Sequence, residues 1–261
     1  MLHINFSKYQ GAGNDFVVID NRDKHFDSAN VQLVSFLCDR RFGVGGDGLM
    51  LLENDPDGSA FLMRYFNSDG REASMCGNGG RCIIAFAVHL GIVNVGELFA
   101  FNAVDGLHEA VYLDENHVSL KMIDVDTIEH ADDAFFMNTG SPHHVAFVDD
   151  VAKADVVGEG RSIRHSSRYA PGGTNVNFVQ LLSSAAIRVR TFERGVEDET
   201  LACGTGVVAS AIAASLKLGG GNEFDVKVEG GDMRVTFQHV NHRFTNVWLI
   251  GPAKFVFKGV I

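Results

Sequence analysis

Two short stretches of the sequence place a cysteine directly before a glycine-rich segment and an apolar run. Cys76 opens "CGNGG" at residues 76–80, and Cys203 opens "CGTG" at residues 203–206. The runs that follow, "CIIAFAVHLG" and "GVVASAIAASLKLG", are typical of helices that end at a glycine. The amides and the dipole at a helix start favour a negatively charged sulfur, and they also bind a carboxylate.

A thiolate on one face of an α-carbon and a thiol on the other can invert that carbon. The thiolate removes the α-proton, and the thiol returns a proton to the opposite face. The α-proton is very weakly acidic, so donors at both helix starts must stabilise the charge that develops on the carboxylate. The pattern therefore predicts inversion of a carboxylate-bearing stereocentre by Cys76 and Cys203.

The elements that position the two cysteines recur in the same order. Strands are expected at "FVVIDNR", "LMLLEN" and "FLMRYF" before Cys76, and at "HVAFVDD", "NVNFVQLL" and "IRVRTF" before Cys203. Cys203 follows Cys76 by 127 residues, and Phe192 follows Phe66 by 126. This internal repeat predicts two homologous halves, residues 1–112 and 113–250, that meet along a cleft. The closing segment "AKFVFKGVI", within residues 251–261, is expected to form a strand that returns to the first half.

Composition limits the class of protein. The chain has 261 residues, 46% of them hydrophobic, which is enough for a substantial core. Its net charge of -11 is spread along the sequence, which argues against a nucleic acid or an anionic membrane as partner. The N-terminus lacks the pattern of a signal peptide, and no apolar run approaches the roughly 20 residues of a membrane span. We expect a soluble, cytoplasmic protein with free thiols.

The other two cysteines, and the possible metal and cofactor motifs, have simpler interpretations. Cys38 and Cys82 lie in apolar runs and are expected to pack in the core. A metal site at Cys76 and Cys82 is disfavoured, because five residues separate them and no second pair matches. No cofactor is expected, since the sequence has neither a Rossmann fingerprint nor a P-loop, and the spacing in "GVGGDG" is wrong for either.

Several motifs together resemble the diaminopimelate epimerase family, cofactor-independent enzymes of lysine and peptidoglycan precursor synthesis. They are "GAGNDFVVID", "FNSDGREASMCGNGGRC", "GSPHHV", "GTNVNFVQ" and "ERGVEDETLACGTG", and they run nearly end to end in the family's order. The resemblance implies an α/β (α+β) fold of two pseudosymmetric domains, each a β-sheet rolled around a central helix. It also implies interconversion of L,L- and meso-diaminopimelate at a site between the domains.

The resemblance further implies roles for individual residues. Cys76 is the expected proton donor and Cys203 the expected proton acceptor. His143 and Glu193 hold positions that tune the pKa values of the cysteines. The guanidinium of Arg194 suits the second carboxylate of the substrate, which it can bind with two hydrogen bonds. The substrate-binding set implied by the resemblance is Asn14, Asn67, Gly77, Asn78, Asn175, Glu193, Arg194, Gly204 and Thr205, with no metal.

The sequence departs from the family's pattern at three places. Ser141 stands where many members have Asn, and Gly48 stands where some have Gln. The loop from Arg194 to Cys203 is one residue longer than the common form, so residues 197–199 receive no role.

Three alternatives remain open at this point. A proline racemase-type enzyme shares the fold and the cysteine pair but typically has "MCGHG", where this chain has Asn78. Phenazine-biosynthesis isomerases share the fold without the cysteine pair. A non-catalytic binding module would need no reactive thiols. The expected partner is diaminopimelate as a small-molecule substrate, with no nucleic acid and no membrane, and a homodimer is the assembly considered.

Overall fold

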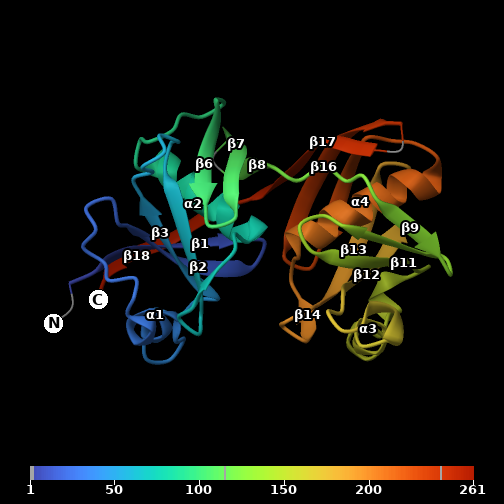
Figure 1. The fold of residues 1–261 in the computed structure, drawn as a ribbon, viewed down its shortest axis with the longest axis horizontal. Coiled ribbons are helices and arrows are strands. Elements are labelled where there is room, and N and C mark those ends of the chain that lie inside the picture. The colour runs from blue at the N-terminus through green and yellow to red at the C-terminus, as the bar shows by residue number, and fades with distance from the viewer. Residues whose placement is uncertain (1–2, 115, 242) are drawn as a thin grey trace. The chain divides into compact units, whose positions relative to one another are not determined.

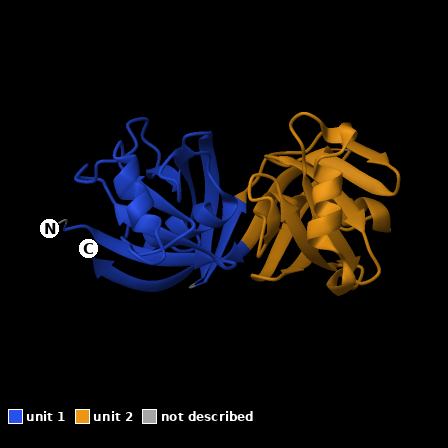
Figure 2. Cartoon of the chain, turned by 90° about the horizontal axis from the view of Figure 1, so that it is seen from below, with its two compact units in different colours: residues 1–120, 251–261 blue, residues 121–250 orange. Residues whose placement is uncertain are grey.

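The computed structural model describes residues 3–114, 116–241 and 243–261. The chain forms two compact units, shown in Figure 2: unit 1 is residues 1–120 with 251–261, and unit 2 is residues 121–250. The division follows Leu120 rather than residue 112, because strand β8 (His117–Lys121) pairs with β7 (Gly106–Asp114) of unit 1. Each unit is a mixed α+β structure.

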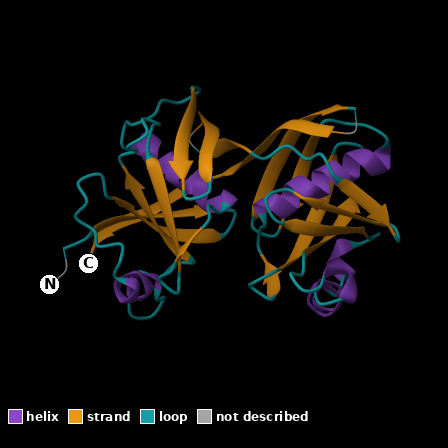
Figure 3. Ribbon diagram, in the orientation of Figure 1, coloured by secondary structure: helices purple, strands orange, loops and turns teal. Residues whose placement is uncertain are grey.

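Unit 1 winds its strands around helix α2 (Gly77–His89), with the shorter α1 (Val31–Cys38) at its side (Figures 1 and 3). Parallel pairs, β2 with β3 and β4 with β6, alternate with antiparallel pairs. Its other strands are β1 (Asn5–Gly11), β2 (Asn14–Asp20), β3 (Gly48–Glu53), β4 (Leu62–Asn67), β5 (Glu72–Ala73), β6 (Leu98–Ala103) and β18 (Lys254–Val260).

Unit 2 winds its strands around helix α4 (Gly204–Leu218), with α3 (Val156–Arg164) in the place that α1 takes in unit 1. Two 3-10 turns, Val151–Lys153 and Ser167–Tyr169, flank α3. The strands are β9 (Ile128–Ala131), β10 (Ala134–Asn138), β11 (Pro142–Phe147), β12 (Asn175–Leu181), β13 (Ala186–Glu193), β14 (Asp198–Thr200), β15 (Glu223–Val228), β16 (Gly231–Val240) and β17 (Arg243–Pro252), the last ending in unit 1.

The two units repeat one pattern of strand pairing. Strands β1 to β7 of unit 1 pair in the order and directions of β10 to β16 of unit 2, including the two parallel pairs, β11 with β12 and β13 with β15. The two units differ in the strand that pairs with the outer edge of their first strand, β1 in unit 1 and β10 in unit 2. β9 pairs with β10 in unit 2, whereas the C-terminal β18 pairs with β1 in unit 1. The internal repeat predicted from the cysteine spacing is confirmed.

Both central helices are buried along most of their length, and this explains their small residues. All but a few residues of α4 are buried, among them the run from Gly206 to Ser215. In α2 a Cβ at Gly79 would lie 3.2 Å from the sulfur of Met50, and one at Gly80 would lie 2.9 Å from the sulfur of Met75. Glycine therefore leaves room for these two methionine side chains, besides any ligand that approaches the backbone.

In the described parts of the chain, no helix is long and apolar enough to cross a membrane.

The contact between α3 and the sheet of unit 2 gives a stability prediction. A Cβ on Gly160 would lie 2.5 Å from the Cβ of Phe192, which is fully buried against Val156 and Phe178. We expect Gly160→Ala to lower the free energy of unfolding by about 1–3 kcal/mol, because the new methyl group overpacks the contact with Phe192. This loss outweighs the preference of helices for alanine over glycine, which is about 1 kcal/mol. Urea unfolding followed by circular dichroism measures this. The exposed Ser162→Ala on the same helix is the control, and an equal loss there would contradict the packing argument.

Candidate active site

In unit 1 the first cysteine stands at the start of helix α2. Cys76 is the N-cap residue, with extended backbone (φ -93°, ψ 132°), and its carbonyl accepts from the amide of Gly80 at 2.7 Å. Its side chain makes no capping hydrogen bond to the first turn. The first amides of a helix have no partner within the helix, so Cys76 lies beside donors that suit an anion.

Asn14, at the start of β2, presents an oxygen to this cysteine. The sulfur of Cys76 donates to Oδ1 of Asn14 at 3.8 Å, and Nδ2 of Asn78 donates to the same oxygen at 3.4 Å. The side-chain nitrogen Nδ2 of Asn14 donates in turn to the carboxylate of Asp47. Because a carboxylate only accepts, Nδ2 must face Asp47, and Oδ1 is left to face Cys76. Arg40 holds Asp47 in place with a 2.7 Å ion pair.

A buried arginine lies one turn into the same helix. Arg81 has no exposed surface, and its guanidinium donates to Oδ1 of Asn78 at 2.7 Å and to the carbonyls of Gly77 and Pro252 at 3.3 Å. Within the described residues no carboxylate forms an ion pair with it. Burial lowers the pKa of Arg81, and the nearby thiols of Cys82 and Cys76 oppose that shift. Arg81 thus ties Gly77 and Asn78 to the end of β17.

In unit 2 the second cysteine stands at the start of helix α4 and meets a network of hydroxyl groups. Cys203 is buried, with its sulfur 3.5 Å from Oγ1 of Thr205. That hydroxyl lies 2.9 Å from Nε2 of His143 and 3.1 Å from Oγ of Ser141. Thr139 donates to the carbonyl of Thr205 at 2.8 Å, which fixes the first turn of the helix.

His143 is the fully buried member of this network. Burial lowers its pKa to about 3, and the positive charge of Arg194 acts in the same direction. The imidazole is therefore neutral near pH 7. His144, the next residue on β11, bonds instead to the hydroxyl of Tyr169 at 2.7 Å and takes no part in the network.

Asn175 and the end of β13 complete the site in unit 2. Nδ2 of Asn175 donates to Ser141 at 3.0 Å, and its oxygen accepts from the backbone amide of Arg194 at 2.8 Å. Glu193 accepts from the hydroxyl of Thr200 at 2.9 Å; burial raises the pKa of Glu193, and that bond opposes the shift. The side chain of Arg194 is exposed and reaches the carbonyl of Gly172 at 3.5 Å.

The structure brings together most, but not all, of the expected residues within each unit. Asn14, Cys76 and Asn78 are in contact in unit 1. Asn67 is exposed at the end of β4, where its backbone closes a turn with residues 70 and 71. In unit 2 the set in contact comprises Ser141, His143, Asn175, Cys203 and Thr205, with Arg194 bound through its backbone.

The three departures from the family's pattern each have a structural setting. A Cβ on Gly48 would lie 2.5 Å from the carbonyl oxygen of Phe66, so a longer side chain has no room there. Ser141 keeps a polar group inside the hydroxyl network. In the longer loop, Glu197 pairs with Arg164 at 2.8 Å, and Glu199 likewise pairs with Arg190. These two carboxylates therefore hold the loop.

Sequence reasoning missed Asp47, Arg81, Thr139 and Asn177, which orient the expected residues. Arg81 had a visible signal, because it is a charged residue at the start of an otherwise apolar helix. Asp47 and Asn177 had none, since each lies in a segment whose polar residues are equally typical of turns or strand edges.

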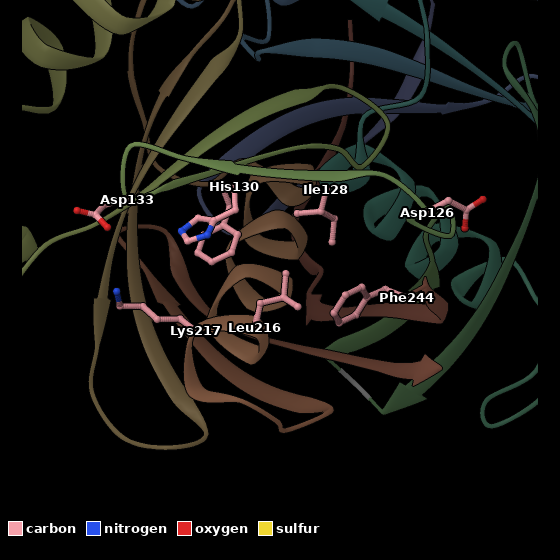
Figure 4. A pocket seen from close by; sticks show the side chains of 8 residues that line it. Asp126, Ile128, His130, Asp133, Leu216, Lys217 and Phe244 are labelled. Atoms are coloured by element: carbon pink, nitrogen blue, oxygen red, sulfur yellow. The ribbon is translucent and has the colours of Figure 1, made fainter. Parts of the chain in front are cut away.

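A separate pocket in unit 2, of about 580 Å³, lies at the opposite end of α4 from Cys203. Figure 4 shows Leu216 and Lys217 of this helix facing Ile128, His130 and Phe244. It contains none of the expected site residues. Across the described residues, no group of three or more His, Cys, Asp or Glu side chains is arranged to hold a metal ion.

Comparison with known proteins identifies the family. The model of the diaminopimelate epimerase family matches residues 6–125 and 135–256. The chain belongs to the diaminopimelate epimerase family. The diaminopimelate epimerase of Flavobacterium psychrophilum is 49% identical, covering 97% of this chain and 98% of its own. That of Chlorobaculum tepidum is 43% identical, covering 96% and 98%.

Solved structures show the same fold more widely than this family. A phenazine biosynthesis protein of the PhzF family from Bacillus anthracis has a TM-score of 0.77 at 13% identity and covers 100% of this chain and 99% of its own. A probable proline racemase from Agrobacterium radiobacter has a TM-score of 0.69 at 17% identity, covering 99% and 92%. At such identities the likeness extends to the fold alone. Membership of the diaminopimelate epimerase family is shown by the sequence matches.

The buried, neutral His143 gives a pH prediction for this family member. An unfolded histidine binds a proton below about pH 6.5, whereas the folded protein resists protonation of His143 until about pH 3. Stability should therefore fall as the pH drops from 6.5 towards 3. In His143→Gln the midpoint of urea unfolding should fall less steeply over this range. His144 is present in both proteins, so its own titration cancels. Parallel curves for the two proteins would rule out this contribution.

Proposed function

We propose that this protein interconverts L,L-diaminopimelate and meso-diaminopimelate in lysine biosynthesis, as an isomerase that needs no cofactor. One observation carries the proposal: in a chain of this family, each of two repeated units places a cysteine at the start of its central helix. Inversion needs an acid and a base on opposite faces of one carbon, and the repeat supplies two such groups.

In the proposed reaction the two thiols exchange roles with direction. Starting from the L,L isomer, the thiolate of Cys203 takes the α-proton, and the thiol of Cys76 gives its proton to the other face of the carbanion. Each turnover leaves Cys203 protonated and Cys76 ionised, so the reverse reaction starts from that state. The amides that begin α2 and α4, at Gly77-Asn78 and Gly204-Thr205, hold the reacting carboxylate and stabilise its developing charge.

Other side chains recognise the rest of the substrate. Arg194 is exposed and carries a planar guanidinium, which suits the distal carboxylate. Asn14, Asn67 and Asn175 bind polar groups of the substrate, and His143 and Glu193 adjust the acidity of the cysteines. Unit 1 and unit 2 are the two halves of the epimerase, one carrying Cys76 and the other Cys203. Homodimer assembly and a cytoplasmic location stay predictions of the sequence; sedimentation velocity tests the first.

The two-thiol reaction is tested with single variants in heavy water. Cys76→Ala and Cys203→Ala should each abolish net epimerisation, because each proton transfer needs its own group within hydrogen-bond reach. Cys76→Ala should still exchange the α-proton of the L,L isomer for deuterium, and Cys203→Ala should not. Nuclear magnetic resonance of recovered substrate measures both outcomes.

The buried Cys82→Ala on α2 is the matched control and should keep its activity. Reversed exchange in the two variants would reverse the assigned roles. Epimerisation near the wild-type rate in either variant would overturn the two-thiol mechanism. Inversion of L-proline in place of diaminopimelate would favour the proline racemase alternative.

The anchoring role of Arg194 is tested by Arg194→Lys. Lysine keeps the charge but loses the fork of two donors, so KM for diaminopimelate should rise about 10- to 100-fold. Arg188→Lys is the control, because Arg188 lies on β13, the strand that ends just before Arg194, and is paired with Glu229. An unchanged KM for Arg194→Lys would mean that another group binds the distal carboxylate.

A further inference from the structure

Asn177 is a buried polar residue of unit 2 that lies outside the expected catalytic and substrate-binding sets. It lies on β12 with no exposed surface, beneath the first turn of α4. A Cβ on Gly206 would lie 2.3 Å from Oδ1 of Asn177, so glycine at this point of the helix makes room for the amide. Buried polar side chains are almost always hydrogen-bonded, and Asn177 has partners for both ends of its amide.

The amide of Asn177 has only one orientation that satisfies its neighbours. Nδ2 donates to the backbone carbonyl of His144 at 3.0 Å, and a carbonyl only accepts. Oδ1 accepts from the hydroxyl of Thr191 at 3.0 Å. Nδ2 therefore also faces Nδ1 of His143, at 3.0 Å, and that nitrogen must be the acceptor. The proton of the neutral imidazole then sits on Nε2.

A protonated Nε2 sets the direction of the hydroxyl network at Cys203. Nε2 of His143 lies 2.9 Å from the hydroxyl of Thr205 and 3.1 Å from that of Ser141, so its hydrogen is offered to both oxygens. Ser141 already accepts from Asn175 at 3.0 Å, which leaves its own hydrogen for Thr205 at 3.1 Å. With both lone pairs of Thr205 facing donors, its hydroxyl hydrogen is left for the sulfur of Cys203, which lies 3.5 Å away.

We propose that Asn177 is a positioning residue that locks His143 in the Nε2-protonated form, so that the Thr205 hydroxyl donates to the Cys203 thiolate. The use of that thiolate in catalysis rests on the proposed function, but the hydrogen-bond chain does not. Of the described charged residues, Arg194 acts on His143. Glu193, its neighbour in sequence, accepts a hydrogen bond from Thr200.

The test measures thiol ionisation directly, without substrate. The pH dependence of iodoacetamide alkylation is followed by peptide mass spectrometry, which reports Cys203 and Cys76 separately in one sample. Asn177→Leu and Thr205→Val should each raise the alkylation midpoint of Cys203 by about one to two pH units, the worth of one hydrogen bond to a charged group. Cys76 is the internal reference and should not shift. Thr205→Ser keeps the hydroxyl and should restore the wild-type midpoint.

Thr191→Val is the matched control, because it removes a bond to the oxygen of Asn177 and leaves both bonds of Nδ2. An equal shift of Cys203 in Thr191→Val would mean that general loosening causes the effect and would overturn the proposal. An unshifted Cys203 in Thr205→Val would overturn it as well.

The tautomer is read from the wild-type protein, whether or not the Asn177 variant folds. In ¹⁵N spectra of histidine-labelled protein, Nδ1 of His143 should give a pyridine-like shift and Nε2 a pyrrole-like shift. The reverse assignment would refute the role of Asn177. Neither measurement uses diaminopimelate, so a failure of the proposed substrate and a failure of this inference give different results.

Discussion

The structure depends on one constraint, which is that a helix fully enclosed by a sheet must still begin at an accessible point. Apart from Arg81, the enclosed parts of α2 and α4 are mostly apolar or small, because strands surround them. At the starts of these helices the first amides have no acceptor within the helix. Cys76 and Cys203 stand at these starts. Because the rest of each helix is enclosed, its free amides lie at its start, and an anion and a reactive sulfur can meet only there.

The repeat conserves backbone geometry between the units and not the side chains at the two cysteines. Cys76 faces an amide oxygen, that of Asn14, which accepts a hydrogen from the thiol. Cys203 faces the hydroxyl of Thr205, which can give one. Arg81, the buried cation of α2, has Val208 at the position 127 residues later. Two equivalent helix starts have therefore acquired different electrostatic surroundings.

How far the sequence predicts this molecule depends on the range of each interaction. The cysteine junctions and most of the expected strands are local patterns, and they appear near the expected bounds; α2, for example, begins at Gly77, where a glycine-rich start was expected. The repeat was visible because its spacing is regular. The return of β18 to the first half was expected. Its pairing with β1, at the edge that β9 fills beside β10 in unit 2, was not expected, since it joins segments far apart in sequence.

Two of the orienting residues, Asp47 and Asn177, could not be predicted from the sequence for the same reason. Asp47 acts on Asn14 from 33 residues away, and Asn177 acts on His143 from 34. An asparagine or aspartate in such a segment has many ordinary explanations, and only the atoms that it faces select one. Several glycines near the two helix starts also leave room for neighbouring side chains, which the sequence did not indicate.

The place of β18 also bears on the order in which the chain folds during synthesis. Residues 121–250 contain all of β9 to β16 and most of β17, so nearly all the strands of unit 2 have been made by residue 250. Unit 1 begins first, but the edge of β1 that does not pair with β2 lacks its partner until residues 254–260 have followed. Until then β1 has an open edge with unpaired backbone groups, which is the kind of surface that recruits strands from other chains. The half synthesised first is thus the half completed last, and its exposure to aggregation lasts for the whole translation of unit 2.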